Sequence, residues 1–277
     1  MASPNEIRLV TTWPVDPRLQ SSALLPTLEF SRRGGFAVAT APTEQRPNVM
    51  RLCREAFAQG ISFGWRPVPQ IKAVFFDMDA TVIAEESLVE LSALAGQEEA
   101  VTRITERAMA GELDFKSALV ERVALIKGLS MDDVRKVITR LTLNPGIREF
   151  VSSCTKKKIP TFMVSGGFTE FAAHVQELVG FVETRTNVLE IENGRLTGRV
   201  VGNIVDAQGK KAYLHETCAK LGIKPEEAAA VGDGANDIPM LNAAGLAVGF
   251  RPKPVLLDHI HVLNGGGDHR FLEPFLG

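Results

Sequence analysis

The amino-acid sequence predicts an α/β fold built on a doubly wound parallel sheet. Short apolar runs, each of the length of a buried strand, recur along the chain and are separated by segments of helix length. Four of these runs lie at residues 71–76, 161–164, 228–231 and 246–248. Strands that alternate with helices form parallel sheets, in which ligands bind beyond the carboxyl ends of the strands. The residues that directly follow these runs are therefore the first candidates for a functional site.

Composition and charge narrow the class of protein. The chain has 277 residues, 45% hydrophobic and 23% charged, which corresponds to a globular protein of one large domain or two average ones. No apolar run approaches the ~18 residues of a membrane span, and the first residues lack the basic and apolar segments of a signal peptide. The net charge of −2 argues against a broad basic surface. We therefore expect no membrane or nucleic-acid partner.

The cysteines indicate a reduced, cytoplasmic compartment. Cys53, Cys154 and Cys218 are odd in number, lie far apart and have no C-x-x-C spacing. This pattern argues against both a disulfide framework and a zinc site. The oligomeric state stays open, and a homodimer is possible.

The pattern divides the chain into three parts. Residues 1–70 are rich in proline and predict a small α+β extension of unknown role, with its clearest helix at 49–59. Residues 71–85 and 144–277 form the expected α/β core. Residues 86–143 are too long for one crossover helix and predict a helical cap, a candidate lid.

Start and stop signals place the elements of the cap and the core. Four cap helices are expected at residues 87–95, 98–110, 114–127 and 131–141, from their glycine stops and polar caps. Asn144 and Pro145 fit the N-cap and first position of the next core helix. Asn193 and Gly194 predict a hairpin turn within residues 188–205.

Polar side chains follow two of the expected strands. Asp77 and Asp79 are carboxylates two residues apart, so they can point to the same side as the chain leaves the sheet. Ser165 and Gly166, followed by a second glycine, join a strand to a helix, where a hydroxyl and free backbone N–H groups can hold a phosphate. The alternatives are an aspartate that caps a turn and a serine–glycine turn that only packs tightly.

Two further clusters lie later in the chain. Asp233, Asn236 and Asp237 bring three oxygen-bearing side chains into five residues, which suits a hard cation such as Mg²⁺. A plain polar turn is the alternative, and the spacing fits neither a calcium loop nor a dinucleotide fingerprint. Lys210 and Lys211 precede a helical run at 212–221, where lysines are usually solvated. The doubly wound fold would gather the ends of the strands, with Asp77, Ser165 and Asp233, at one edge of the sheet, as a site for phosphate and Mg²⁺.

At these residues the sequence resembles the haloacid dehalogenase superfamily, whose phosphatases carry D-x-D-x-T, then Ser or Thr, then Lys, then G-D-x-x-x-D. The match covers about residues 71–258. More narrowly, residues 108–115, 122–123, 164–168 and 231–237 resemble the phosphoserine phosphatase family within it. The resemblance implies a Mg²⁺-dependent phosphomonoester hydrolase that releases L-serine from L-phosphoserine.

The resemblance also implies roles for individual residues. Asp77 would be the nucleophile that forms an aspartyl-phosphate, and Asp79 the general acid and base. Mg²⁺ would be held by the Asp77 carboxylate, the Asp79 backbone carbonyl and Asp233. The phosphate would be contacted by Ser165, Gly166, Lys210 and Asn236, with Asp237 and Thr81 as supporting residues.

Substrate choice is expected from the cap. The resemblance places Glu86 near the substrate ammonium and Arg122 near its carboxylate, with Met109 and Phe115 lining the lid. Without the resemblance, Met109 and Phe115 would be read as core packing. The alternatives are a phosphotransferase to homoserine, a phosphatase for another small monoester and, from a different class, a non-catalytic ligand-binding module.

The chain departs from the family pattern in two places. Ala80 stands where serine is common in these phosphatases, which removes a polar contact. The first 70 residues do not show the two-helix, four-strand pattern of the amino-acid-binding regulatory domains that some members carry. Feedback control by serine is therefore not expected.

Overall fold

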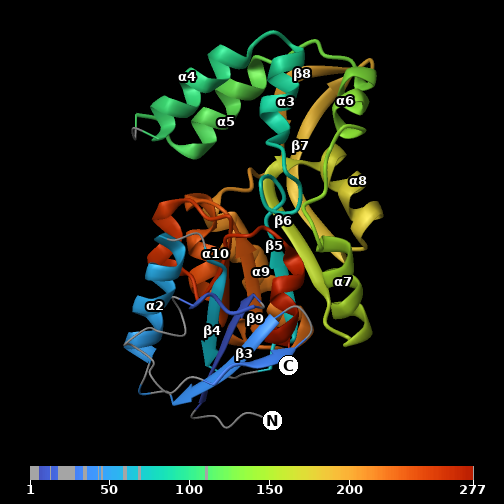
Figure 1. Cartoon of the computed structure of the whole chain (residues 1–277). Coiled ribbons are helices and arrows are strands. Elements are labelled where there is room, and N and C mark those ends of the chain that lie inside the picture. The colour runs from blue at the N-terminus through green and yellow to red at the C-terminus, as the bar shows by residue number, and fades with distance from the viewer. Residues whose placement is uncertain are drawn as a thin grey trace.

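The computed structural model describes residues 6–12, 14–17, 29–33, 36–42, 44, 46–58, 61–67, 70–109 and 112–276. The strands form one sheet in the order β2-β3-β1-β4-β11-β10-β9-β5-β6-β7-β8. Its middle part, from β11 to β7, is parallel throughout. Figure 1 shows the helical cap at one end of this sheet and the N-terminal strands at the other.

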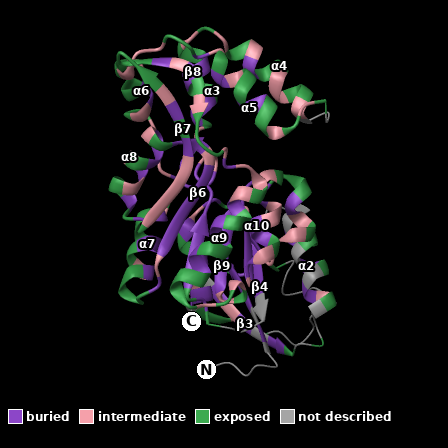
Figure 2. Ribbon diagram, turned by 180° about the vertical axis from the view of Figure 1, so that it is seen from behind, coloured by how far each residue is buried: buried purple, intermediate pink, exposed green. Residues whose placement is uncertain are grey.

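The four expected core strands form, and helices cover both faces of the sheet. They are β5 (Ala73–Phe76), β6 (Thr161–Phe168), β9 (Ala228–Gly232) and β10 (Leu246–Phe250), joined by the short β11 (Val262–Asn264). Successive residues of β5 enter different cores: Val74 packs with the cluster of α7 (Ile147–Lys156) and α8 (Thr169–Val179), whereas Phe75 packs with that of α9 (Ala207–Leu221) and α10 (Ile238–Ala243). Figure 2 shows the buried strands between these helices. The predicted doubly wound α/β fold is confirmed.

The N-terminal strands extend the core sheet instead of forming a separate layer. β1 (Glu6–Thr12), β2 (Ser31–Arg33), β3 (Phe36–Pro42) and β4 (Phe63–Pro67) are antiparallel in the order β2-β3-β1-β4, and β4 pairs with β11. The expectation that a four-strand pattern is missing is therefore wrong. The strand signal is weak because β3 buries Ala37, Ala39 and Ala41, and alanine has a low strand propensity.

The helix of this region, α2 (Arg46–Ala58), agrees with the expected one and packs on the N-terminal strands through Val49 and Leu52. Residues 18–28, between β1 and β2, and residues 59–60, where the expected helix ends, lie outside the described residues. The second helix of the two-helix pattern is thus not assigned.

The four expected cap helices are present. They are α3 (Ser87–Leu94), α4 (Glu98–Met109), α5 (Phe115–Ala124) and α6 (Met131–Ile138). Asp114 accepts hydrogen bonds from the backbone N–H groups of Lys116 and Ser117, and Ser130 forms a capping box with Asp133. Residues 110–111, the expected end of the second cap helix, lie outside the described residues.

The expected hairpin connects the core sheet to the cap. β7 (Glu183–Glu192) and β8 (Arg195–Val201) are joined by Asn193 and Gly194, with φ of 50° and 71°, as a type I′ turn requires. Near this turn the backbone N–H of Gly128 donates to Leu196 O at 2.8 Å, and Leu196 N–H donates to Leu129 O at 2.9 Å. The hairpin thus rises beside the cap helices (Figure 1).

Two predicted helix starts are wrong. α7 begins at Ile147 after Gly146, whose φ is 77°, because the side chain of Asn144 donates to the carbonyls of Thr81 and Ile83 instead of capping a helix. α9 begins at Ala207, capped by Asp206, and not at residue 212. Lys210 therefore lies in the first turn of a helix.

The remaining elements are short 3₁₀ segments: η2 (Pro225–Glu227), η3 (Ala235–Asp237), η4 (Pro254–His259) and η5 (His269–Leu276). Among the described residues, no helix combines the length and the apolar character that crossing a membrane requires.

Candidate active site

The site is built around Asp77, where β5 ends. The backbone N–H of Asp77 donates to Val231 O at 2.9 Å, so β5 and β9 end at the same level. Met78 O then accepts from Val82 N at 2.8 Å and from Ile83 N at 3.0 Å, which closes a tight loop. Within this loop Ala80 has a φ of 53°, a left-handed conformation that costs free energy for a residue with a Cβ. The loop leads the chain directly from Asp77 into the cap.

Lys210 lies between two carboxylates. Its Nζ is 2.7 Å from Asp77 Oδ2 and 2.8 Å from Asp237 Oδ1, and its side chain is 1% exposed. Burial alone would lower the pKa of Lys210, but Asp237 and Asp77 raise it above its ordinary value, so the ammonium stays charged. The alternative reading of Lys210 as a solvated lysine is wrong, because α9 turns this side chain inward; its neighbour Lys211 is exposed.

Asp237 binds the Lys210 ammonium and also stabilises the loop in which Asp237 itself lies. Its Oδ2 accepts from the backbone N–H groups of Asp233 and Gly234 at 3.1 and 3.2 Å. Burial, and then the charge of Asp77, raise the pKa of Asp237 to about 7. A Cβ at Gly232 would lie 2.3 Å from the Asp237 carboxyl carbon, so only glycine fits there.

Three buried carboxylates could hold a cation. Asp77, Asp233 and Asp237 each offer an oxygen within 4.8 Å of the others. Burial and the neighbouring Asp77 raise the pKa of Asp233, and a divalent cation would relieve that repulsion. Such a set of oxygens fits a hard cation. Since Asp237 is already engaged by three hydrogen bonds, Asp77 and Asp233 are the more available ligands.

Asn236 and Lys253 complete this edge of the site. Asn236 Nδ2 lies 3.4 Å from Asp77 Oδ2. Lys253 Nζ forms an ion pair with Asp233 Oδ2 at 2.9 Å, from a side chain that is 58% exposed. Sequence reasoning missed Lys253, although its place shortly after the apolar run at 246–248 could have pointed to it.

The Ser165–Gly167 segment is a bulge in β6, not the start of a helix. The pairing with β7 shifts between Val164 and Phe168, and α8 begins only at Thr169, so the predicted strand end at 164 is wrong. Ser165 Oγ accepts from Gly167 N at 3.0 Å. Asn187, a buried residue of β7 that sequence reasoning missed, donates from Nδ2 to Gly166 O at 2.8 Å.

Asp79 lies beside the cap. Burial, then Glu86 and Asp77, raise the pKa of Asp79 well above its ordinary value, while hydrogen bonds from Ser87 oppose the shift. Ser87 Oγ donates to Asp79 Oδ2 at 3.0 Å. Sequence reasoning missed Ser87, since a serine at a helix start ordinarily reads as a cap. Thr81 lies in the same loop, and its carbonyl accepts from Asn144 Nδ2 and His269 Nε2 at 2.8 and 3.0 Å.

The cap contributes charged side chains to the same region. Glu86 is exposed to solvent, yet partial desolvation raises its pKa. The positive charges of Lys253 and Arg122 oppose this rise, whereas the carboxylates of Asp233 and Asp77 add to it. Burial lowers the pKa of Arg122, and Glu86 opposes that shift. Glu85, the neighbour of Glu86, accepts from Thr142 N at 3.0 Å, which ties it to the end of the cap segment.

Phe115 reaches the same region from the first turn of α5. A Cβ at Gly166 would lie 3.0 Å from Phe115 Cζ, so this ring packs against the bulge of β6. The side chain of Met109, the other expected lid residue, lies outside the described part of the chain.

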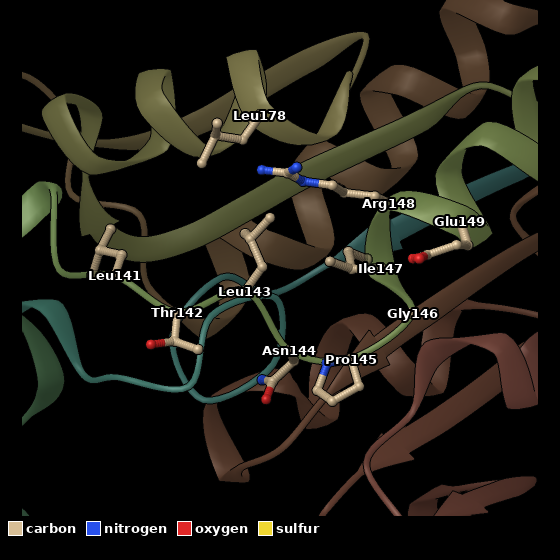
Figure 3. A pocket seen from close by; sticks show the side chains of 10 residues that line it. All are labelled: Leu141, Thr142, Leu143, Asn144, Pro145, Gly146, Ile147, Arg148, Glu149 and Leu178. Atoms are coloured by element: carbon tan, nitrogen blue, oxygen red, sulfur yellow. The ribbon is translucent and has the colours of Figure 1, made fainter.

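A separate cavity lies where the cap segment returns to the core. It has a volume of about 410 Å³ and is lined by residues 141–149 and by Leu178. Figure 3 shows Arg148 extending toward Leu178 across it. None of the predicted site residues lines this cavity, so it is separate from the carboxylate cluster that forms the candidate active site.

Comparison with known proteins places these motifs in a family. The haloacid dehalogenase-like hydrolase model matches residues 71–245. The chain is 46% identical over 211 residues to the phosphoserine phosphatase of Polaromonas sp., covering 73% of this chain and 89% of that protein. It is 44% identical over 211 residues to the phosphoserine phosphatase of Albidiferax ferrireducens, covering 74% and 89%.

Solved structures agree with the sequence comparison. A haloacid dehalogenase family hydrolase from Salmonella enterica serovar Typhi has a TM-score of 0.89 at 30% identity, covering 98% of this chain and 97% of that one. A phosphoserine phosphatase solved as a phospho-aspartyl intermediate analogue has a TM-score of 0.70 at 34% identity, covering 76% and 100%. The chain belongs to the haloacid dehalogenase-like hydrolases and, within them, to the phosphoserine phosphatase family.

Proposed function

We propose that this chain is an enzyme that hydrolyses L-phosphoserine to L-serine and phosphate through an aspartyl-phosphate. The observation that carries the proposal is the position of Asp77, a buried carboxylate whose Oδ2 lies 2.7 Å from Lys210 Nζ. The carboxylate of Glu86 on the cap interacts with Asp77 and Asp233, and Arg122 interacts with Glu86. Membership of the family supports the same substrate.

In the first half-reaction an Asp77 oxygen bonds to phosphorus while the bond from phosphorus to the serine oxygen breaks. The leaving alkoxide needs a proton, and Asp79 supplies it from its carboxylic acid form. The raised pKa of Asp79 fits this role, because burial favours the protonated form.

In the second half-reaction water hydrolyses the aspartyl-phosphate. Asp79, now ionised, takes a proton from the attacking water, whose oxygen bonds to phosphorus as the bond to Asp77 breaks. The enzyme returns to its starting state, and inorganic phosphate leaves.

Fixed donors stabilise the phosphate oxygens during both halves. We assign this role to the Lys210 ammonium, the Ser165 hydroxyl, the Gly166 backbone and the Asn236 amide. Asp237 orients Lys210 through the contact of 2.8 Å, and the Thr81 backbone, held by Asn144 and His269, fixes the loop after the nucleophile.

The cation in this proposal is Mg²⁺. The carboxylates of Asp77 and Asp233 and the backbone carbonyl of Asp79 would hold it, which suits its preference for oxygen ligands. When bound, Mg²⁺ offsets the repulsion between the Asp77 carboxylate and the anionic phosphate.

The cap, residues 86–143, acts in this proposal as a lid that selects the substrate. Glu86 pairs with the substrate ammonium, and Arg122 grips its carboxylate. Phe115, packed on the phosphate-binding bulge, and Met109 cover the bound molecule. The free, buried thiols of Cys154 and Cys218 fit a cytoplasmic location, where disulfides are rare.

The test is phosphate release from L-phosphoserine, phosphothreonine, phosphoethanolamine and an aryl phosphate, each with Mg²⁺ and with a chelator. We expect a strong preference for L-phosphoserine that chelation abolishes. Turnover of all the esters at similar rates would indicate that the natural substrate is another small monoester. Formation of phosphohomoserine when homoserine is added would show that the protein is a phosphotransferase and not a hydrolase. If no monoester is turned over, the protein is a non-catalytic ligand-binding module.

A further inference from the structure

One cap residue engages both oxygens of the Asp79 carboxylate. Ser87 Oγ donates to Asp79 Oδ2 at 3.0 Å, and the Ser87 backbone N–H donates to Asp79 Oδ1 at 3.3 Å. Ser87 is the first residue of α3 and is fully buried. A hydroxyl removed from water in this way needs a partner, and the carboxylate of Asp79 is that partner.

The Ser87–Asp79 pair is enclosed from the side of the core. A Cβ on Gly167 would lie 2.7 Å from Met78 Cε, 3.0 Å from Asp79 Oδ2 and 3.2 Å from Ser87 Oγ. The backbone of the β6 bulge therefore closes against the pair, and the Asp79 carboxylate has little room to turn away from Ser87.

We propose that Ser87 is a positioning residue for the proton transfers of Asp79. The inference rests on the proposed function, because it assigns Ser87 an effect on the acid–base step of that reaction. The Ser87 hydroxyl keeps one orientation of the carboxylate, so that Asp79 points at the leaving oxygen in the first half-reaction and at water in the second. A general acid contributes only when it lies within hydrogen-bond reach of the atom it protonates.

The placement also links substrate binding to chemistry. Glu86 directly precedes Ser87 and is the N-cap residue of α3, whose first residue is Ser87. A substrate ammonium bound by Glu86 would fix the backbone that carries the Ser87 hydroxyl. The cap thereby aligns the acid at the same time as it binds the amino-acid part of the substrate.

The test compares Ser87→Ala with wild type on L-phosphoserine and on a series of aryl phosphates whose leaving groups differ in pKa. Nitrophenolate leaves without protonation, whereas the serine alkoxide does not. For Ser87→Ala we expect kcat/KM to fall about 10- to 100-fold on L-phosphoserine and less than about threefold on p-nitrophenyl phosphate. These factors follow from the rate enhancements that general acid–base catalysis and correct positioning of the acid typically give. Along the aryl series, kcat/KM should depend more steeply on leaving-group pKa in the variant.

Two further variants keep the test decisive. Ser92→Ala removes another buried hydroxyl of α3, one that donates to Val89 O at 2.8 Å within the helix, and should leave the leaving-group dependence unchanged. Ser87→Thr keeps a hydroxyl and should restore most of the L-phosphoserine rate. If Ser87→Ala does not fold, Gly167→Ala, which presses on the same pair, should reproduce the steeper dependence.

The outcomes separate this inference from the proposed function. Equal losses on all esters, or an unchanged slope in the variant that folds, would overturn the positioning role and leave Ser87 a residue of the fold. If wild type does not turn over L-phosphoserine but does hydrolyse aryl phosphates, the substrate assignment fails and the aryl series alone decides the role of Ser87. Failure of wild type on every ester would overturn both.

Discussion

Lys210 Nζ lies 2.7 Å from Asp77 Oδ2, although one residue lies on α9 and the other at the end of β5. The two side chains are 1% and 4% exposed, so this ion pair is formed almost without water. Lys210 also pairs with Asp237. One buried ammonium thus balances carboxylates from two separate loops, and the geometry of the site depends on it.

Lys210→Met should therefore reduce both stability and turnover. Removing one member of a buried charge cluster leaves uncompensated carboxylates, which costs about 3–5 kcal/mol. Urea unfolding without metal measures the loss, with Lys211→Met at the exposed neighbouring position as the matched control. An unfolding free energy equal to that of the control would mean that the carboxylates do not depend on Lys210.

Asp77→Asn should abolish phosphate release from L-phosphoserine and keep the fold. The substitution preserves volume and removes the charge that attacks phosphorus, while Lys210 keeps its ion pair with Asp237. Phosphate release and circular dichroism check the two parts, and Asp132→Asn, at an exposed carboxylate of α6, is the control. Turnover near that of wild type would show that another residue is the nucleophile.

Arg122→Ala should lower kcat/KM for L-phosphoserine much more than for an aryl phosphate. A hydrogen bond to a charged group is worth about 1.5–3 kcal/mol, so kcat/KM should fall about 10- to 100-fold on L-phosphoserine and little on an aryl phosphate. Arg103→Ala removes an exposed arginine of the cap that pairs with Glu99 and should change neither rate. Equal losses on both substrates would assign Arg122 to the phosphate or to the fold.

The position of the site at one edge of the sheet could be predicted from sequence, because the carboxyl ends of parallel strands lie together. Asp77 directly follows the apolar run at 71–76, and Asp233 comes two residues after the run at 228–231. The sheet brings their carboxylate oxygens within 4.8 Å of each other. The short spacing from Asp233 to Asp237 likewise kept both residues in one loop. These placements follow from local pattern and topology alone.

The remaining parts depend on contacts that sequence distance hides. The family resemblance selects Lys210, but the local pattern does not distinguish it from Lys211; the start of α9 at Ala207 is what buries Lys210. Asn144 is a residue type that commonly caps helices, but the chain that returns from the cap to the core places it beside the loop of Thr81, to whose carbonyl its side chain donates. Ser87 likewise becomes a site residue only through the turn that folds the cap back onto Asp79.

His269 is the other support of that loop. Its Nε2 lies 3.0 Å from Thr81 O, and its ring stacks on Phe250 at a centroid distance of 4.2 Å. Burial lowers the pKa of His269 from an ordinary value of 6.5 to about 4, while the Thr81 carbonyl and Asp268 act in the opposite direction. The neutral imidazole is thus the form that fits the fold at neutral pH.

The stability of the protein should consequently fall as the pH drops from 6.5 toward 4. In this window the unfolded chain takes up a proton at His269 and the folded chain does not, so acid favours unfolding. From the two pKa values, this histidine alone should cost about 2 kcal/mol between pH 7.5 and pH 5. His269→Phe keeps the stacked ring without the titration, so its unfolding free energy in urea should decrease by about 2 kcal/mol less over the same interval. The variant loses the hydrogen bond to Thr81 O and should be less stable than wild type at pH 7.5, with the gap closing at pH 5. Parallel decreases in the two proteins would show that His269 titrates equally in the folded and unfolded states.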